Sequence, residues 1–156
     1  MLRVLAIVLI LSTSPAQALS CLQHPTLSDS FRTAAGADRA YVLAVGTIDR
    51  LGGQQRTART DLRGVPQPYM AKARFSGLRA GAGGLNQRFN EIITVEVSCA
   101  GQWCGAVPQG GYIAFLERRG DTHVLRSGPC PDFALHRDSP VARTEVRACL
   151  AGQCPR

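Results

Sequence analysis

Four cysteines of this chain form two pairs of identical spacing, which is compatible with three kinds of chemistry. Cys99 and Cys104 enclose four residues, among them Trp103, the only tryptophan, and Cys149 and Cys154 repeat the spacing. Four thiolates could hold a zinc ion, each pair could act as a redox couple, or each pair could form a structural disulfide. Disulfide oxidoreductases place two residues between their cysteines rather than four, and none of the three histidines stands at ligand spacing beside either pair. The spacing therefore favours disulfides, with a metal-binding module as the remaining alternative.

The N-terminal residues indicate export, and hence an oxidising environment. A single positive charge, Arg3, is followed by an apolar run over residues 4–11 and by a small-x-small triplet that ends at Ala18, the layout of a secretory signal. We expect a signal peptide over residues 1–18 and a single mature domain over residues 19–156, either periplasmic or secreted. Cleavage after Ser20 and lipidation of Cys21 are the alternatives. No later apolar run reaches the roughly 20 residues that a transmembrane helix needs, so no transmembrane segment is expected.

All six cysteines lie beyond the expected signal, and an even number in an exported domain predicts three disulfides. We expect Cys99 to bond to Cys104, because Cys99 ends a predicted strand and Cys104 begins the return of the chain. Cys149 and Cys154 are expected to form the second short-range bond.

Hydrophobic patterning predicts strands over residues 41–48, 69–77, 88–99, 111–119 and 122–128. The third of these is the clearest, because Ile93, Val95 and Val97 alternate with polar residues. A short helix is expected between residues 21 and 40, and turn-rich loops over residues 49–68 and 78–87.

The last element has a helical signature. Ser139 is placed as an N-cap, Pro140 as the first helical residue and Gly152 just past the end, which predicts a helix over about 140–150. Five strands with a short N-terminal and a C-terminal helix indicate a mainly β domain, either a small antiparallel barrel or a sandwich.

Positive charge is concentrated in one segment of a chain whose net charge is +7. Residues 50–88 hold one acid, Asp61, and eight basic residues, which we take as candidate binding residues: Arg50, Arg56, Arg59, Arg63, Lys72, Arg74, Arg79 and Arg88. An exported protein seldom meets nucleic acid, so we expect an acidic glycan, another acidic surface or an acidic protein face as the partner, or else a solvated pair of loops. Trp103 is a further candidate as an interface anchor, although packing in the core is the more common role and is expected here.

The order of motifs resembles that of netrin-type modules and the N-terminal domains of tissue inhibitors of metalloproteinases. The resemblance extends over roughly residues 21–133 and rests on Cys21, on Phe31, Ala37 and Asp38, on the strand 41–48, on Phe75-Ser76-Gly77, on Trp103-Cys104-Gly105, and on segments 110–117 and 128–133. It implies a five-stranded, antiparallel Greek-key barrel of the OB type, flanked by helices. It also implies a disulfide between Cys21 and Cys130, which is the pair left by the other two.

The resemblance also implies an alternative function, metalloproteinase inhibition through the N-terminus of Cys21. Those inhibitors begin with Cys-x-Cys and chelate the zinc of the target with the free amino group and the carbonyl group of the first cysteine. Here Cys21 is followed by Leu22-Gln23-His24, and cleavage after Ala18 would leave two residues in front of Cys21.

Residue types suited to catalysis are present but scattered. Asp29, Asp38 and Asp49 have no obvious carboxylate or histidine mate, Ser28 and Ser30 lie near His24 only in sequence, and no G-x-S-x-G turn occurs. We therefore expect no enzymatic activity, no catalytic or metal-binding residues and no cofactor. The sequence predicts an exported, non-catalytic binding module that recognises a protein or an acidic surface.

Overall fold

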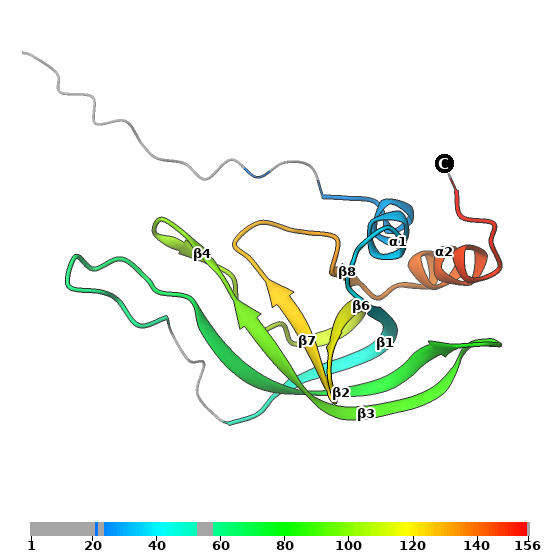
Figure 1. Cartoon of the computed structure of the whole chain (residues 1–156), viewed down its shortest axis with the longest axis horizontal. Helices are drawn as coiled ribbons and strands as arrows, with labels where there is room; N and C mark the ends of the chain where they lie inside the picture. Colours follow the sequence, from blue (N-terminus) through cyan, green and yellow to red (C-terminus); the bar gives the residue numbers. More distant parts are fainter. Residues whose placement is uncertain (1–20, 22–23, 53–57, 156) are drawn as a thin grey trace, which may run out of the picture.

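The computed structural model describes residues 21, 24–52 and 58–155 (Figure 1). The expected signal peptide, its cleavage sites and Arg56 lie outside these residues. The elements, in chain order, are α1 (Leu27–Ala35), β1 (Tyr41–Arg50), β2 (Tyr69–Gly81), β3 (Gly84–Val97), β4 (Cys99–Ala100), β5 (Trp103–Cys104), β6 (Gly110–Arg119), β7 (Thr122–Ser127), β8 (Leu135–Arg137) and α2 (Pro140–Leu150). No helix in the described part of the chain is long and apolar enough to cross a membrane.

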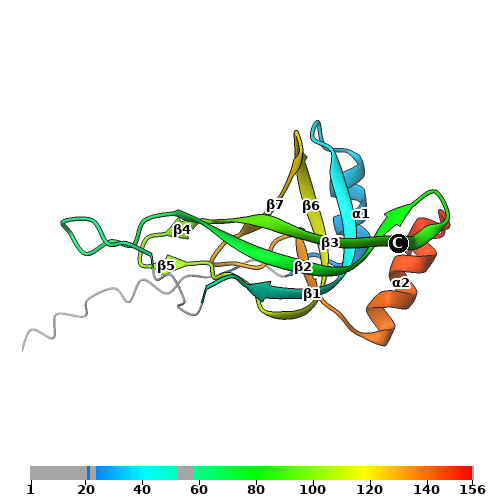
Figure 2. The same ribbon diagram turned by 90° about the horizontal axis from the view of Figure 1, so that it is seen from below.

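Five strands close into a ring. Their order is β1-β2-β3-β7-β6, and β6 pairs back onto β1 (Figure 2). The short strand β8 pairs with residues 112–114 of β6, whereas β7 pairs with residues 117–119 (Figure 1). The prediction of a mainly β fold is confirmed. The expectation of a fully antiparallel sheet is wrong at one place, because β3 and β7 are parallel. A closed ring with an odd number of strands cannot alternate in direction throughout, so one neighbouring pair must be parallel.

The inside of the ring holds the main hydrophobic core. Ile93, Val95 and Val97 of β3 are fully buried there, as their alternation with polar residues predicts. Phe75 of β2 and Phe89 of β3 pack against each other in the same core, with tilted rings at a centroid distance of 5.5 Å. This core fixes which side chains of β2 and β3 point inward, and therefore which point outward.

A second core lies outside the ring, beneath the two helices (Figure 1). Ile113 and Phe115 of β6 face it together with Leu27 of α1 and Val146 of α2. Neighbouring residues of β6, such as Ala114 and Leu116, face the inner core. Because β6 is buried on both faces, its sequence is a continuous apolar run rather than an alternating pattern.

The helix ends follow their capping residues. Thr26 caps α1 by accepting from the backbone N–H of Asp29, whose carboxylate returns to Thr26 in a capping box. Ser139 caps α2 and Pro140 opens it, as predicted from the sequence, and Gly152 adopts a φ of 76° just past the end.

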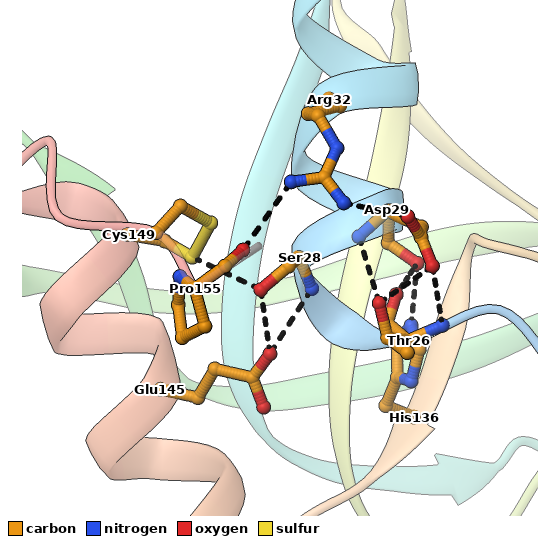
Figure 3. Close-up of polar contacts among 10 residues, drawn as sticks. Thr26, Ser28, Asp29, Arg32, His136, Glu145, Cys149 and Pro155 are labelled. Carbon is orange, nitrogen blue, oxygen red and sulfur yellow. Dashed lines mark hydrogen bonds and ion pairs between the residues drawn. A yellow bond between two sulfur atoms is a disulfide. The ribbon is translucent and has the colours of Figure 1, made fainter.

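Polar contacts hold α1 against α2 (Figure 3). Ser28 donates its backbone N–H and its hydroxyl to Glu145 Oε1, at 3.1 and 2.8 Å, and Arg32 Nη1 donates to the carbonyl oxygen of Pro155 at 3.3 Å. The C-terminal segment is thus tied back onto the first helix.

The cysteines form the three expected bonds: Cys21–Cys130, Cys99–Cys104 and Cys149–Cys154. Cys99 and Cys104 are direct partners in the two-residue ladder of β4 and β5. Both Cys-x4-Cys pairs are therefore oxidised in this structure, and their sulfur atoms are not available as thiolate ligands.

Candidate binding surface

The outer side of β2 and β3 carries a mixed cationic and apolar surface. Cross-strand pairing sets Met70 opposite Glu96, Arg74 opposite Ile92 and Leu78 opposite Arg88. Six exposed side chains of this side define what we call the β2–β3 outer face: Met70, Lys72, Arg74, Leu78, Arg88 and Ile92. The two helices lie on the other side of the molecule (Figure 1), so they leave this face uncovered.

Three large apolar side chains of this face are unusually exposed. Met70, Leu78 and Ile92 retain 55%, 40% and 53% of their accessible surface. Strands with one face on a core normally expose polar residues on the other. The β2–β3 outer face therefore departs from the composition of an ordinary solvated sheet, which makes it a candidate interaction site.

The cations of this face are arranged across both strands. Lys72 Nζ donates to Thr94 Oγ1 at 2.7 Å, which fixes the ammonium group above β3. Arg74 lies between Asp49 on β1 and Ile92 on β3 in the register of the sheet. With Arg88, the face has three cations against two carboxylates, those of Asp49 at the β1 edge and of Glu96 opposite Met70. Glu96 is already paired with Arg119 at 3.1 Å and with Arg126 at 3.7 Å, so the local charge of the face favours anionic ligands.

The structure divides the predicted basic segment into separate places. Lys72, Arg74 and Arg88 share the outer face, whereas Arg59 and Arg63 lie in the loop between β1 and β2. Two further candidates, Arg50 and Arg79, make contacts within the protein. Arg50 Nε donates to the carbonyl oxygen of Val107 at 3.0 Å. Arg79 Nε donates to Gln87 Oε1 at 2.9 Å, and its guanidinium carbon lies 6.0 Å from the centroid of the Phe89 ring. A segment that is continuous in sequence is thus not one patch in space.

Trp103 is exposed, and the expectation that it packs in the core is wrong. It keeps 53% of its accessible surface and stands opposite Ala100 next to the turn of the β4–β5 hairpin. The hairpin is only two residue pairs long, so it has no inner face on which a tryptophan could be buried. Trp103 remains a candidate interface anchor.

A cluster of charges beside the hairpin of β6 and β7 is satisfied internally. Glu117, only 4% exposed, pairs with Arg119 at 2.8 Å, Arg126 at 3.2 Å and Arg39 at 3.3 Å. The hydrogen bond from Arg119 is the main cause that lowers the pKa of Glu117. Because these arginines neutralise a buried carboxylate and Glu96, they contribute little to the binding of an external anion.

A serine and a histidine far apart in sequence meet at the base of α1, but they do not form an accessible catalytic pair. Ser30 Oγ lies 2.7 Å from His136 Nε2 and also donates to the carbonyl oxygen of Thr26 at 3.0 Å. Ser30 is fully buried, so no substrate can reach its hydroxyl group. In the sequence Ser30 lies near His24, but 106 positions separate it from His136. Only the folded chain brings His136 of β8 next to Ser30, so the sequence alone did not predict this pair.

His123 is buried, unlike the half-buried His136, and it lies beside Phe89 of the inner core. His123 Nδ1 lies 2.8 Å from Glu91 Oε2, and the ring packs edge-on against Phe89 at 5.0 Å. The Nε2 atom is buried without a hydrogen-bond partner among the described residues. Within residues 21, 24–52 and 58–155, no three His, Cys, Asp or Glu side chains cluster as a metal site would require.

His136 is expected to make stability depend on pH in the acidic range. Burial, aided by the nearby His24, lowers the pKa of His136 to about 4, against the opposing influence of Glu145 and the backbone of Phe133. Ser30 on α1 and the ring of Phe115 on β6 also face it. In the unfolded chain the imidazole of His136 takes up a proton near pH 6.5, whereas in the folded protein it stays neutral until about pH 4. The contribution of His136 to the free energy of unfolding is therefore complete above pH 6.5 and is lost as the pH falls toward 4.

We expect the melting temperature of the wild-type protein to fall between pH 7 and pH 5 by more than that of His136→Gln. The window stops at pH 5 so that the carboxylates remain largely ionised. Identical falls in the two proteins would show that His136 does not carry this dependence.

Comparison with known protein families, with curated protein sequences and with solved structures found no match for this chain.

Proposed function

We propose that this protein is an exported, disulfide-stabilised binding module of the OB type, and that its β2–β3 outer face holds an acidic ligand without catalysing a reaction. Three disulfides fit a chain that folds outside the cytoplasm. The observation that carries the binding role is the outer face itself, where three cations lie among three exposed apolar side chains.

The strand order supports the OB-type interpretation. A five-stranded ring closed by β1 and β6 fits a small five-stranded barrel of this type, and the parallel pair β3–β7 is what an odd number of strands in a closed ring requires. The disulfide from Cys21 to the loop after β7 is the one that the resemblance to netrin-type modules implies.

The composition of the face supports an extended acidic ligand that also has apolar groups. Arginine and lysine attract anions over a range set by salt, and Met70, Leu78 and Ile92 offer apolar area that water does not favour. The affinity for the acidic ligand is therefore expected to fall as the salt concentration rises. Part of the affinity should remain at high salt, because the apolar contacts are not screened.

The test uses heparin as an acidic probe, with a salt gradient on a heparin column. The triple variant Lys72→Gln, Arg74→Gln, Arg88→Gln is expected to bind about tenfold more weakly than wild type, because each exposed charge pair contributes roughly 0.5 kcal/mol. The matched control removes three exposed arginines elsewhere, Arg118→Gln, Arg137→Gln and Arg147→Gln, with the same change in net charge. Elution of the two variants at the same salt concentration would show that heparin binding depends only on net charge. The β2–β3 outer face would then not be the binding site.

Two other functions make different demands. Metalloproteinase inhibition requires a free amino group on Cys21, and metal binding requires reduced Cys99, Cys104, Cys149 and Cys154. Determination of the N-terminal residue of the exported protein tests metalloproteinase inhibition, because only a chain that begins at Cys21 has that free amino group. Metal binding would need reduction of two of the disulfides described above.

A further inference from the structure

The loop between β1 and β2 ends in a tightly organised turn. The carbonyl oxygen of Arg59 accepts from the backbone N–H of Gln67 at 2.7 Å, and the backbone N–H of Asp61 donates to the carbonyl oxygen of Val65 at 2.9 Å. The carboxylate of Asp61 accepts from the backbone N–H groups of Arg63 and Val65, each at 2.9 Å. These bonds hold residues 59–67 in a defined shape.

Leu62 stands at the tip of this turn and is fully exposed. Arg59 and Arg63, both exposed, lie on either side of it in the turn. Asp61, the only acid of segment 58–68, has its carboxylate engaged with the backbone. The turn therefore presents one apolar side chain between two cations.

Trp103 forms a second apolar tip at the same end of the molecule. The β4–β5 hairpin that carries it is closed by the Cys99–Cys104 disulfide. In both views the hairpin and the loop before β2 project from the same end, away from α2 (Figures 1 and 2). Segment 98–109 contains no charged residue, so no side-chain charge in it opposes contact with the membrane interface.

We propose that this end of the molecule docks on an anionic lipid surface. Leu62 and Trp103 enter the zone between headgroups and acyl chains, while Arg59 and Arg63 contact the lipid phosphates. Tryptophan prefers the membrane interface, and cations next to an apolar anchor strengthen attachment to anionic lipid. The site is separate from the β2–β3 outer face and does not rest on the function proposed for it.

The arrangement fits lipid better than a folded protein partner. The two apolar side chains stand on separate projecting loops rather than in one continuous patch. A fluid interface adapts to two separate tips, whereas a protein would need two matching pockets. The flanking arginines supply the attraction that brings the tips to an anionic surface.

Trp103 is the only tryptophan, so its fluorescence reports directly on insertion. The purified, disulfide-bonded protein is titrated with vesicles of equal parts phosphatidylcholine and phosphatidylglycerol. We expect a blue shift of the emission, and quenching when the acyl chains carry bromine. Vesicles of phosphatidylcholine alone should give a much weaker response, since they offer no net negative charge.

Variants assign the response to this end of the molecule. Leu62→Ser is expected to weaken vesicle binding about tenfold, in line with the loss of one buried leucine side chain. Val141→Ser, which changes an apolar residue of α2 that is 78% exposed, should leave binding unchanged. Arg59→Gln with Arg63→Gln should weaken binding to the anionic vesicles and reduce its salt dependence.

Two results would overturn the proposal. One is an emission spectrum that anionic vesicles do not shift. The other is equal binding by wild type and Leu62→Ser. The heparin variant with Lys72, Arg74 and Arg88 replaced is expected to retain the fluorescence response, which separates this proposal from the one for the outer face.

Discussion

Loss of the Cys21–Cys130 disulfide is expected to destabilise the protein about twice as much as loss of the Cys149–Cys154 disulfide. The first bond joins cysteines 109 positions apart, and the second joins cysteines 5 positions apart. In the chain-entropy description, closing loops of these lengths contributes about 4.8 and about 2.2 kcal/mol. The longer bond also ties the segment before α1 to the loop between β7 and β8, whereas the shorter one closes only the turn after α2.

The measurement compares urea unfolding of two double variants, Cys21→Ser with Cys130→Ser and Cys149→Ser with Cys154→Ser. Replacing both cysteines of a pair leaves no free thiol to exchange with the other bonds. Equal losses of unfolding free energy would contradict the account, because they would show that the long-range bond does not restrict the unfolded chain.

Gly77→Ala is expected to cost about 3 kcal/mol of stability, at the upper end of the range for overpacked sites. Gly46 of β1 and Gly77 of β2 are direct partners in the sheet. A β-carbon on Gly77 would lie 2.6 Å from the α-carbon of Gly46 and closer still to the carbonyl oxygen of Val45. Both obstacles are backbone atoms, so no side-chain rotation can relieve the clash, and the two strands would have to separate.

Gly36→Ala is the matched control for this substitution. Gly36 ends α1 with a φ of −89°, and a β-carbon there would approach only the carbonyl oxygen of Arg32, at 3.4 Å. Its effect is expected to stay within about 1 kcal/mol and to be neutral or stabilising, because alanine restricts the unfolded chain more than glycine does. The proposed close approach of β1 and β2 would be refuted if Gly77→Ala unfolded at the same urea concentration as Gly36→Ala.

Local signals predicted most of the elements, but the expected loop over residues 78–87 is wrong, because β2 runs to Gly81 and β3 begins at Gly84 as a tight hairpin. The alternation in β3, the cap of Ser139 and Pro140, and the turn between β6 and β7 are all written in short stretches of sequence, and the corresponding elements are observed. The parallel pairing of β3 with β7 was not predicted, because it follows from closing five strands into a ring and not from any one of them.

The functional surface was only partly predictable, because it depends on which strands become neighbours. Met70, Lys72 and Arg74 could be assigned to one side of β2 by alternation alone. Ile92 and Arg88 join them only through the register of β2 with β3. Trp103 was misassigned, since sequence did not show that its hairpin would be too short to bury it.

The central claim is that an exported chain, closed by three disulfides, acts through its surface and not through a cysteine N-terminus. The most direct measurement is the intact mass of the exported protein, with and without reduction and alkylation. The account predicts a chain that begins at Leu19 and is six hydrogens lighter than its reduced form. A chain that begins at an unmodified Cys21, or that contains free thiols, would contradict it and would favour the inhibitor or the metal-binding function instead.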